Sequence, residues 1–145
     1  LSVDSTIENN KWADDIAEIS GVAVDYPIVC DLDYKVTKLY GMVNQEHVDE
    51  KGMPFTVRSV FFIGPDKKVK AIITYPANVG RNFDEILRVL KALQYTTEYP
   101  VACPVDWAPG KKIVVPPTVS DADAQAKYKD LEIVKPYLRY STGPQ

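Results

Sequence analysis

The stretch that decides the fold is DEKGMPFTVRSVFFIGPDKKVKAIITYPANVGRNFDEILRVLKALQ, residues 49–94. Within it, residues 57–63 and 69–75 are rich in β-branched and aromatic side chains, which favour strands. Residues 64–67, Gly-Pro-Asp-Lys, separate these two runs and have the composition of a tight turn. A turn this short can join only antiparallel neighbours, so the sequence predicts a β-hairpin.

The same stretch continues into an amphipathic helix. Asn82 is a helix-capping residue, and Asp84, Glu85 and Lys91 carry the charges that suit the two ends of the helix dipole. The apolar residues recur at helical spacing and form one face: Phe83, Ile86, Leu87, Leu90 and Leu93. We predict that this face packs against a sheet.

The N-terminal region predicts a second amphipathic helix. Ser5 or Thr6 can cap it, because a hydroxyl oxygen accepts the free amides of a first turn. The helix runs to about Ile19, and Trp12, Ile16 and Ile19 form an apolar stripe along it.

Residues 27–30, PIVC, read as a short buried strand that precedes a second short helix. Asp31 or Asp33 can cap this helix, which runs through Tyr40 and ends at Gly41.

Prolines crowd the chain after residue 98, and the regular periodicity fades. Residues 120–129 fit a short helix capped by Ser120, and residues 137–140 fit a final strand. We therefore predict an α/β main domain over residues 1–98 and a small C-terminal domain over residues 99–145.

The composition excludes several classes of function. The net charge of −3 provides no basic excess for a nucleic-acid partner, and no apolar run is long enough to cross a bilayer. Cys30 and Cys103 form no CxxC pair, and the single histidine, His47, has no second ligand near it in sequence. We expect no metal or other cofactor, a reducing and cytoplasmic compartment, a solvated loop around His47 and a buried Cys30.

Several segments together resemble one family. GMPFTVR, FIGPDKKVK, YPANVGRNFDEILRVLKALQ, VACPVDW and KPYLRY are similar to the 1-Cys peroxiredoxins of the peroxiredoxin-6 type, over nearly the whole chain. The resemblance implies a thioredoxin-like fold, partial here, with a small C-terminal α+β dimerisation domain. It also implies a homodimer that reduces hydrogen peroxide and organic or phospholipid hydroperoxides through a cysteine thiolate. A thiol such as glutathione is the expected reductant.

The chain departs from the family pattern at the nucleophile. The family's peroxidatic cysteine lies in a PxxxTxxC motif, which does not occur here, and neither Cys30 nor Cys103 has its framing threonine and proline. The chain also opens on Leu1, inside what reads as a strand. We therefore expect a fragment or processed product whose nucleophile lies in a missing N-terminal segment, and which is inactive alone.

Two arginines match the family's anion site. Arg58 matches the arginine that contacts the thiolate and the peroxide, and Arg81 matches a supporting arginine. A cation about 4 Å from a thiolate, at an effective dielectric of about 20, stabilises it by about 4 kcal/mol at most. From the pattern alone, Arg58 could instead reach solvent or pair with a carboxylate, and Arg81 could pair with Asp84 or Glu85.

Two other functions remain open. Members of the family have been assigned a phospholipase A2 activity that uses a serine, a histidine and an aspartate, and Asp66 matches that aspartate. Pro-Asp-Lys is also ordinary turn chemistry, which would explain Asp66 without any lipase. Alternatively, the chain alone is a non-catalytic module for dimerisation or binding.

Overall fold

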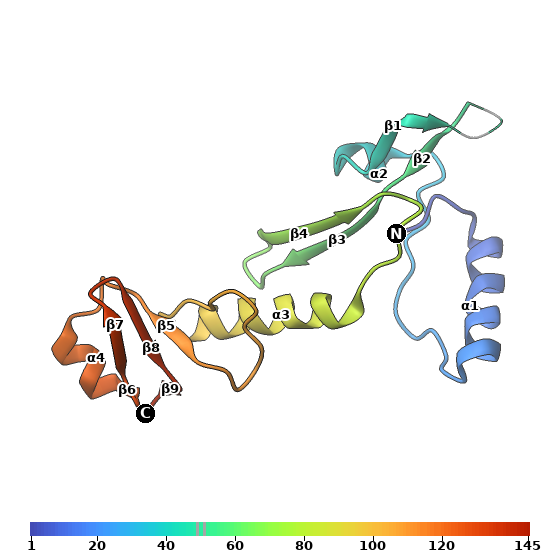
Figure 1. The fold of residues 1–145 in the computed structure, drawn as a ribbon. Helices are drawn as coiled ribbons and strands as arrows, with labels where there is room; N and C mark the ends of the chain where they lie inside the picture. Colours follow the sequence, from blue (N-terminus) through green and yellow to red (C-terminus); the bar gives the residue numbers. More distant parts are fainter. Residues whose placement is uncertain (49, 51) are drawn as a thin grey trace. The chain divides into compact units, whose positions relative to one another are not determined.

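The computed structural model describes residues 1–48, 50 and 52–145, and it describes the backbone but not the side chains of residues 45–47. These residues form two compact units (Figure 1). The first unit consists of residues 1–59 and 74–80, and the second of residues 60–73 and 81–145. No helix in the described part of the chain is long and apolar enough to cross a membrane.

The first unit begins with helix α1, Thr6–Ser20. Ser5 caps it through a capping box, in which its hydroxyl oxygen accepts from the amide of Glu8 and the Glu8 carboxylate accepts from the amide of Ser5. Gly21 ends the helix with a φ of 71°, a left-handed conformation that costs glycine little. The predicted helix is confirmed, and its capping residue is Ser5.

The predicted buried strand at residues 27–30 is wrong. Only a parallel bridge between Ser2 and Cys30 forms there, and Val29 is exposed. The apolar composition of PIVC was the basis of the prediction. A strand also needs a second strand to pair with along its length. Within the described residues, the only bridge of this segment is the one between Cys30 and Ser2.

Helix α2, Lys35–Leu39, is shorter than predicted, and a turn precedes it. The buried carboxylate of Asp31 accepts hydrogen bonds from the amides of Val36 (3.1 Å) and Thr37 (2.7 Å). Burial opposes ionisation of Asp31, but these hydrogen bonds outweigh it and hold its pKa below the ordinary value. Gly41 follows the helix with a φ of 66°, as the predicted helix end requires.

Strands β1, Val43–Val48, and β2, Pro54–Thr56, form an antiparallel pair that the sequence did not predict. His47 lies in β1, so the predicted loop around it is wrong for the backbone, and its side chain is outside the described residues. Asp49 and Lys51, at the start of the stretch quoted first, are also outside them.

The predicted hairpin is confirmed as β3, Arg58–Ile63, and β4, Val69–Tyr75, which pair in a two-stranded sheet. In the turn, the amide of Gly64 donates to Lys68 O and the amide of Lys67 donates to Gly64 O, both at 2.9 Å. Lys67 takes the left-handed conformation that such a turn requires, with a φ of 59°.

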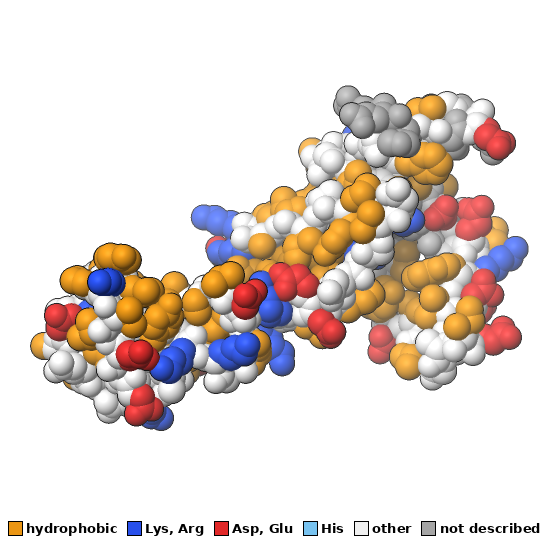
Figure 2. Space-filling model, in the orientation of Figure 1, with side chains coloured by type: hydrophobic (Ala, Val, Ile, Leu, Met, Phe, Trp, Pro, Cys, Tyr) orange, Lys and Arg blue, Asp and Glu red, His pale blue; other side chains and the backbone are white. Residues whose placement is uncertain are grey.

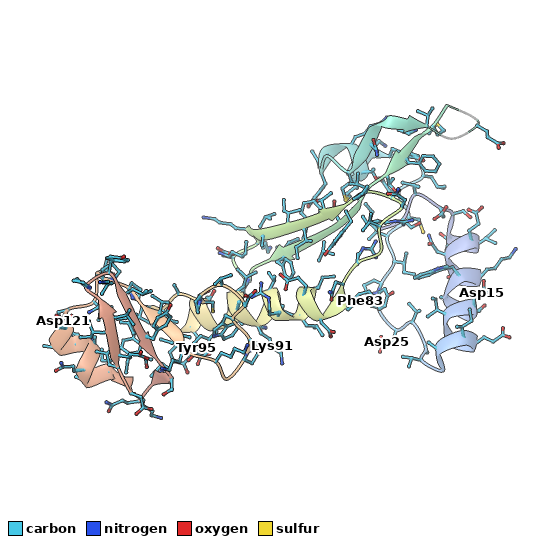
Figure 3. The ribbon with its side chains drawn as sticks, viewed as in Figure 1. Asp15, Asp25, Phe83, Lys91, Tyr95 and Asp121 are labelled. Atoms are coloured by element: carbon cyan, nitrogen blue, oxygen red, sulfur yellow. The ribbon has the colours of Figure 1, made fainter. Side chains whose placement is uncertain are left out.

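The second unit contains helix α3, Phe83–Glu98, which begins at its predicted cap, Asn82. The prediction that its whole apolar face packs against a sheet is wrong, because no residue of α3 is fully buried and Phe83 is 68% exposed. Leu87 and Leu90 of this face are also exposed, whereas Ile86 and Leu93 are half-buried. The last turns of the helix, which include Tyr95, pack against the C-terminal core instead (Figure 3).

The C-terminal part of the second unit has a small core of its own. A three-stranded antiparallel sheet has the order β5-β8-β7, with β5 at Ile113–Val115, β8 at Leu138–Ser141 and β7 at Glu132–Lys135. Helix α4, Asp121–Lys127, leads into β6, Tyr128–Lys129, which pairs with β9, Gly143–Pro144. The core residues are Val101, Trp107, Ile113, Val115, Ala124 and Tyr128. Helix α4 with its Ser120 cap and strand β8 confirm the two predicted C-terminal elements.

A buried arginine ties this C-terminal structure together. The side chain of Arg139 is 2% exposed. Its guanidinium donates to the Asp121 carboxylate at 2.8 Å, to Val119 O at 2.8 Å and to Pro116 O. It therefore joins β8 to the start of α4 and to the loop before it.

We predict that Arg139→Ala lowers the free energy of unfolding of the second unit by about 2–4 kcal/mol, because a buried side chain is removed and two partly buried carbonyl groups lose a charged donor. Urea denaturation followed by the fluorescence of Trp107, in a Trp12→Phe background, measures this loss. Asp121→Asn is the matched control, with an expected cost of about 0–1 kcal/mol because the Asp121 side chain is 75% exposed. Equal losses in the two variants would contradict the assignment.

Candidate functional site: an arginine pocket in the first unit

Arg58 lies at the beginning of β3, directly after a break between two strands. Its Nε donates a hydrogen bond to Ala77 O at 3.4 Å, somewhat longer than the usual N–H···O distance of about 2.7–3.2 Å. The segment that carries Ala77 is turned by a second hydrogen bond, from the amide of Val79 to Pro76 O at 3.0 Å. The loop after β4 therefore holds the guanidinium of Arg58 through a hydrogen bond from its Nε.

An open pocket of about 390 Å³ surrounds this arginine. Three segments of the first unit form its walls: β1, the stretch from β2 into β3, and the loop after β4. The amide of Val57, between β2 and β3, donates to Met42 O at 3.0 Å and fixes the middle segment. The residues that line the pocket are Asn44, Phe55, Arg58, Pro76, Ala77 and Asn78.

The guanidinium of Arg58 has four further N–H groups on its terminal nitrogens, and none forms a hydrogen bond within the described part of the chain. The side chain is exposed, and arginine keeps its charge at any physiological pH. The fork of donors is therefore available to an anion, or to the oxygens of a peroxide, in the pocket. The alternative that Arg58 pairs with a carboxylate is wrong for the described residues.

Arg81 precedes α3 and is exposed. The alternative that it pairs with Glu85 is wrong, because that carboxylate pairs with Arg88, with an Nε to Oε2 distance of 2.6 Å. Within the described residues Arg81 has no ion pair, with Asp84 or any other residue. Arg81 belongs to the second unit and Arg58 to the first, so a shared site for the two remains a prediction.

Asp66 lies in the hairpin turn. Its carboxylate forms an ion pair with Lys70 Nζ at 2.7 Å and accepts from the amide of Lys68 at 3.2 Å. The hydrogen bond from Lys70 is the largest cause of its lowered pKa, which partial burial opposes. These contacts are what a turn aspartate makes for structural reasons.

The two cysteines are poorly placed as nucleophiles. Burial raises the pKa of the Cys103 thiol, although the charge of Arg88 opposes that effect. The Cys30 Sγ accepts hydrogen bonds from Asn9 Nδ2 at 3.2 Å and Thr6 Oγ1 at 3.6 Å, so it is a half-buried structural acceptor rather than a fully buried apolar residue. Neither cysteine lines the Arg58 pocket.

The described residues contain no group of three or more histidine, cysteine or acidic side chains that could hold a metal ion. Sequence reasoning found Arg58 but not the other residues of its pocket. Phe55 lies in the GMPFTVR motif, and Pro76, Ala77 and Asn78 lie in the YPAN motif. Asn44 lies in none of the quoted motifs and belongs to a strand pair that the sequence did not predict.

Comparison with known proteins gives the class of the chain. A family model for the C-terminal domain of 1-Cys peroxiredoxin matches residues 92–131, and one for the AhpC/TSA family matches residues 1–72. A solved structure of Peroxiredoxin 6 from Arenicola marina, a mutant with serine in place of one cysteine, matches with a TM-score of 0.88 and 42% identity, over 98% of this chain and 67% of that one. The fold is therefore that of the thioredoxin-like peroxidases.

Curated relatives narrow the class further. Peroxiredoxin-6 of Rattus norvegicus is 45% identical over 99% of this chain and 69% of its own length. The 1-Cys peroxiredoxin of Dictyostelium discoideum is 47% identical over 99% of this chain, which spans 58% of that relative. The chain belongs to the 1-Cys peroxiredoxins of the peroxiredoxin-6 type, a family of thiol-dependent peroxidases.

We predict that Cys103 reacts slowly with alkylating reagents at neutral pH, because a raised pKa keeps its thiol protonated. A Cys30→Ser variant isolates Cys103, and its rate of reaction with iodoacetamide is measured against pH. The pH at which this rate reaches half its maximum should be higher in the folded chain than in the chain unfolded by guanidinium. A folded midpoint equal to the unfolded one would contradict the effect of burial, and a lower one would show that Cys103 is an activated thiolate.

Proposed function

We propose that this chain supplies the arginine half of a peroxidase site, and that the complete protein reduces hydrogen peroxide and organic or phospholipid hydroperoxides. The observation that carries the proposal is the exposed guanidinium of Arg58. Its Nε donates one hydrogen bond to Ala77 O, and its terminal N–H groups are available to a molecule in the pocket. The thiolate comes from polypeptide outside these residues, since Cys30 and Cys103 are held in other surroundings.

The chemistry needs a fixed positive charge. The cysteine thiolate attacks the nearer oxygen of the hydroperoxide, so that an S–O bond forms, the O–O bond breaks and the cysteine becomes a sulfenic acid. The other oxygen leaves as an alkoxide or hydroxide and takes a proton. A guanidinium at this point stabilises both the attacking anion and the charge that develops on the leaving oxygen. Arg81 is proposed as its supporting cation.

The oxidised cysteine must then be reduced. Two equivalents of a thiol return the sulfenic acid to the thiol, with release of water and formation of one disulfide. A solved structure of the yeast mitochondrial 1-Cys peroxiredoxin, 40% identical to this chain, concerns thiol resolution in that protein through glutathione and thioredoxin systems. We propose a thiol reductant of that kind, a homodimer and a cytoplasmic setting for the complete protein, and a boundary between its two domains after residue 98.

A second candidate is a non-catalytic module that binds another polypeptide. The observation that favours it is the amount of exposed apolar surface, including Ile63 (56%), Ile72 (53%) and Leu87 (52%). Figure 2 shows hydrophobic side chains on the visible face of β3, β4 and α3. An uncovered two-stranded sheet of this kind is a site for pairing with further strands. The phospholipase candidate rests on the match of Asp66 alone.

We predict that Arg58→Met in the complete protein lowers the second-order rate constant of hydrogen peroxide reduction by about 10²–10³-fold. Removal of one positioned hydrogen-bond donor from an active site typically slows a reaction by this factor. Arg58→Lys should recover part of the rate, because a lysine keeps the charge but loses the fork of donors.

Cys30→Ser and Cys103→Ser are the matched controls and should react at the wild-type rate. The present chain alone should show no turnover. The proposal fails if the Arg58→Met protein reacts as fast as wild type, or if the chain alone is active and loses that activity when either cysteine is replaced.

A further inference from the structure

Phe55 is an aromatic residue that the fold leaves open beside the candidate catalytic arginine. Its side chain is 47% exposed although it belongs to β2, and it lines the same pocket as Arg58. Aromatic side chains gain a large amount of free energy on burial, so a half-exposed ring at a pocket wall is available to pack against a bound molecule.

The backbone explains how Phe55 and Arg58 come to share a pocket. Residues three apart in one continuous strand lie on opposite faces of the sheet. Here β2 ends at Thr56 and β3 begins at Arg58, so Val57 interrupts the alternation. The bond from the Val57 amide to Met42 O holds the chain in this broken arrangement.

The pocket has an apolar part and a polar part. Phe55, Pro76 and Ala77 contribute apolar side chains, whereas Arg58 contributes the charge and Asn44 and Asn78 contribute amides. The pocket volume of about 390 Å³ is within the range of small-molecule sites. It is far more than hydrogen peroxide needs, since a water molecule occupies only about 30 Å³ in the liquid.

We propose that Phe55 determines substrate specificity by packing against the apolar group of an organic hydroperoxide while Arg58 binds the peroxide oxygens. This inference rests on the proposed peroxidase function and adds to it the residue that distinguishes alkyl and aryl hydroperoxides from hydrogen peroxide. Hydrogen peroxide has no group that reaches the ring, so Phe55 contributes to the reaction of one substrate class only.

The test uses the complete protein, reduced beforehand, and follows a single oxidation of its cysteine by stopped flow, so that the reductant does not affect the rate. The substrates are hydrogen peroxide and cumene hydroperoxide. Phe55→Ala should lower the rate constant for cumene hydroperoxide by about tenfold relative to that for hydrogen peroxide, a typical effect of losing part of one apolar contact. Phe55→Leu should retain most of the preference.

Ile63→Ala is the matched control, because Ile63 is a comparably exposed apolar residue, 56% exposed, that does not line the pocket. Its ratio of the two rate constants should equal that of wild type. The circular dichroism spectrum and melting temperature of each variant report whether it is folded. Phe55→Thr, whose small β-branched side chain suits a strand and removes the ring, replaces Phe55→Ala if the latter is not folded.

Two outcomes would overturn the assignment of Phe55: an unchanged ratio in folded Phe55→Ala, or in Phe55→Thr where that variant replaces it, or equal losses for both substrates, which would indicate a structural role. Neither result affects the peroxidase proposal if Arg58→Met still slows both reactions. Wild-type rates in Arg58→Met, or no reaction of the wild-type protein, would instead remove the peroxidase proposal and the specificity proposal with it.

Discussion

The hydrogen bond from Arg58 Nε to Ala77 O is the contact on which the functional account depends. This bond connects the loop after β4 to the start of β3. It holds the Arg58 guanidinium at Nε, while the terminal N–H groups remain available to a molecule in the pocket. A free arginine side chain would lose rotamer entropy each time it bound an anion, of about 2 kcal/mol for the whole side chain. A guanidinium already held by the backbone avoids part of that loss.

The two units differ in how they are stabilised. The C-terminal part of the second unit has an apolar core around Trp107, which is 3% exposed, and Ile113. It also has a buried arginine, Arg139, whose partners lie at the start of α4 and in the loop before it. In the first unit, the buried side chains of the described residues are polar: Asn9, Asp31 and Thr37. The first unit therefore rests on caps and local hydrogen bonds, and its apolar side chains, such as Trp12 at 48% exposure, remain available to other polypeptide.

The sequence predicted those elements whose signals are local. The hairpin turn, the Asn82 and Ser120 caps and strand β8 were predicted correctly, and the cap of α1 was narrowed to Ser5 or Thr6. Each of these features depends on residues within a few positions of one another. Strands β1 and β2 were missed, since their pairing joins residues such as Val43 and Thr56 through a register that no local pattern specifies. The apolar face of α3 was recognised, but its neighbours were not, because periodicity indicates which residues are apolar and not what covers them. For the site, the motif predicted Arg58, whereas the pocket around it needed the tertiary structure.

The pKa of the peroxidatic thiol in the complete protein tests the central claim most directly. Ultraviolet absorbance of the thiolate, measured against pH in wild-type protein and in Arg58→Met, gives that pKa in each. If Arg58 stabilises the thiolate, the wild-type pKa lies well below the free-thiol value of about 8.5 and rises in the variant, by as much as roughly 3 for a cation in direct contact. An identical pKa in the two proteins would contradict the account, because the guanidinium would then act on no anion in that pocket.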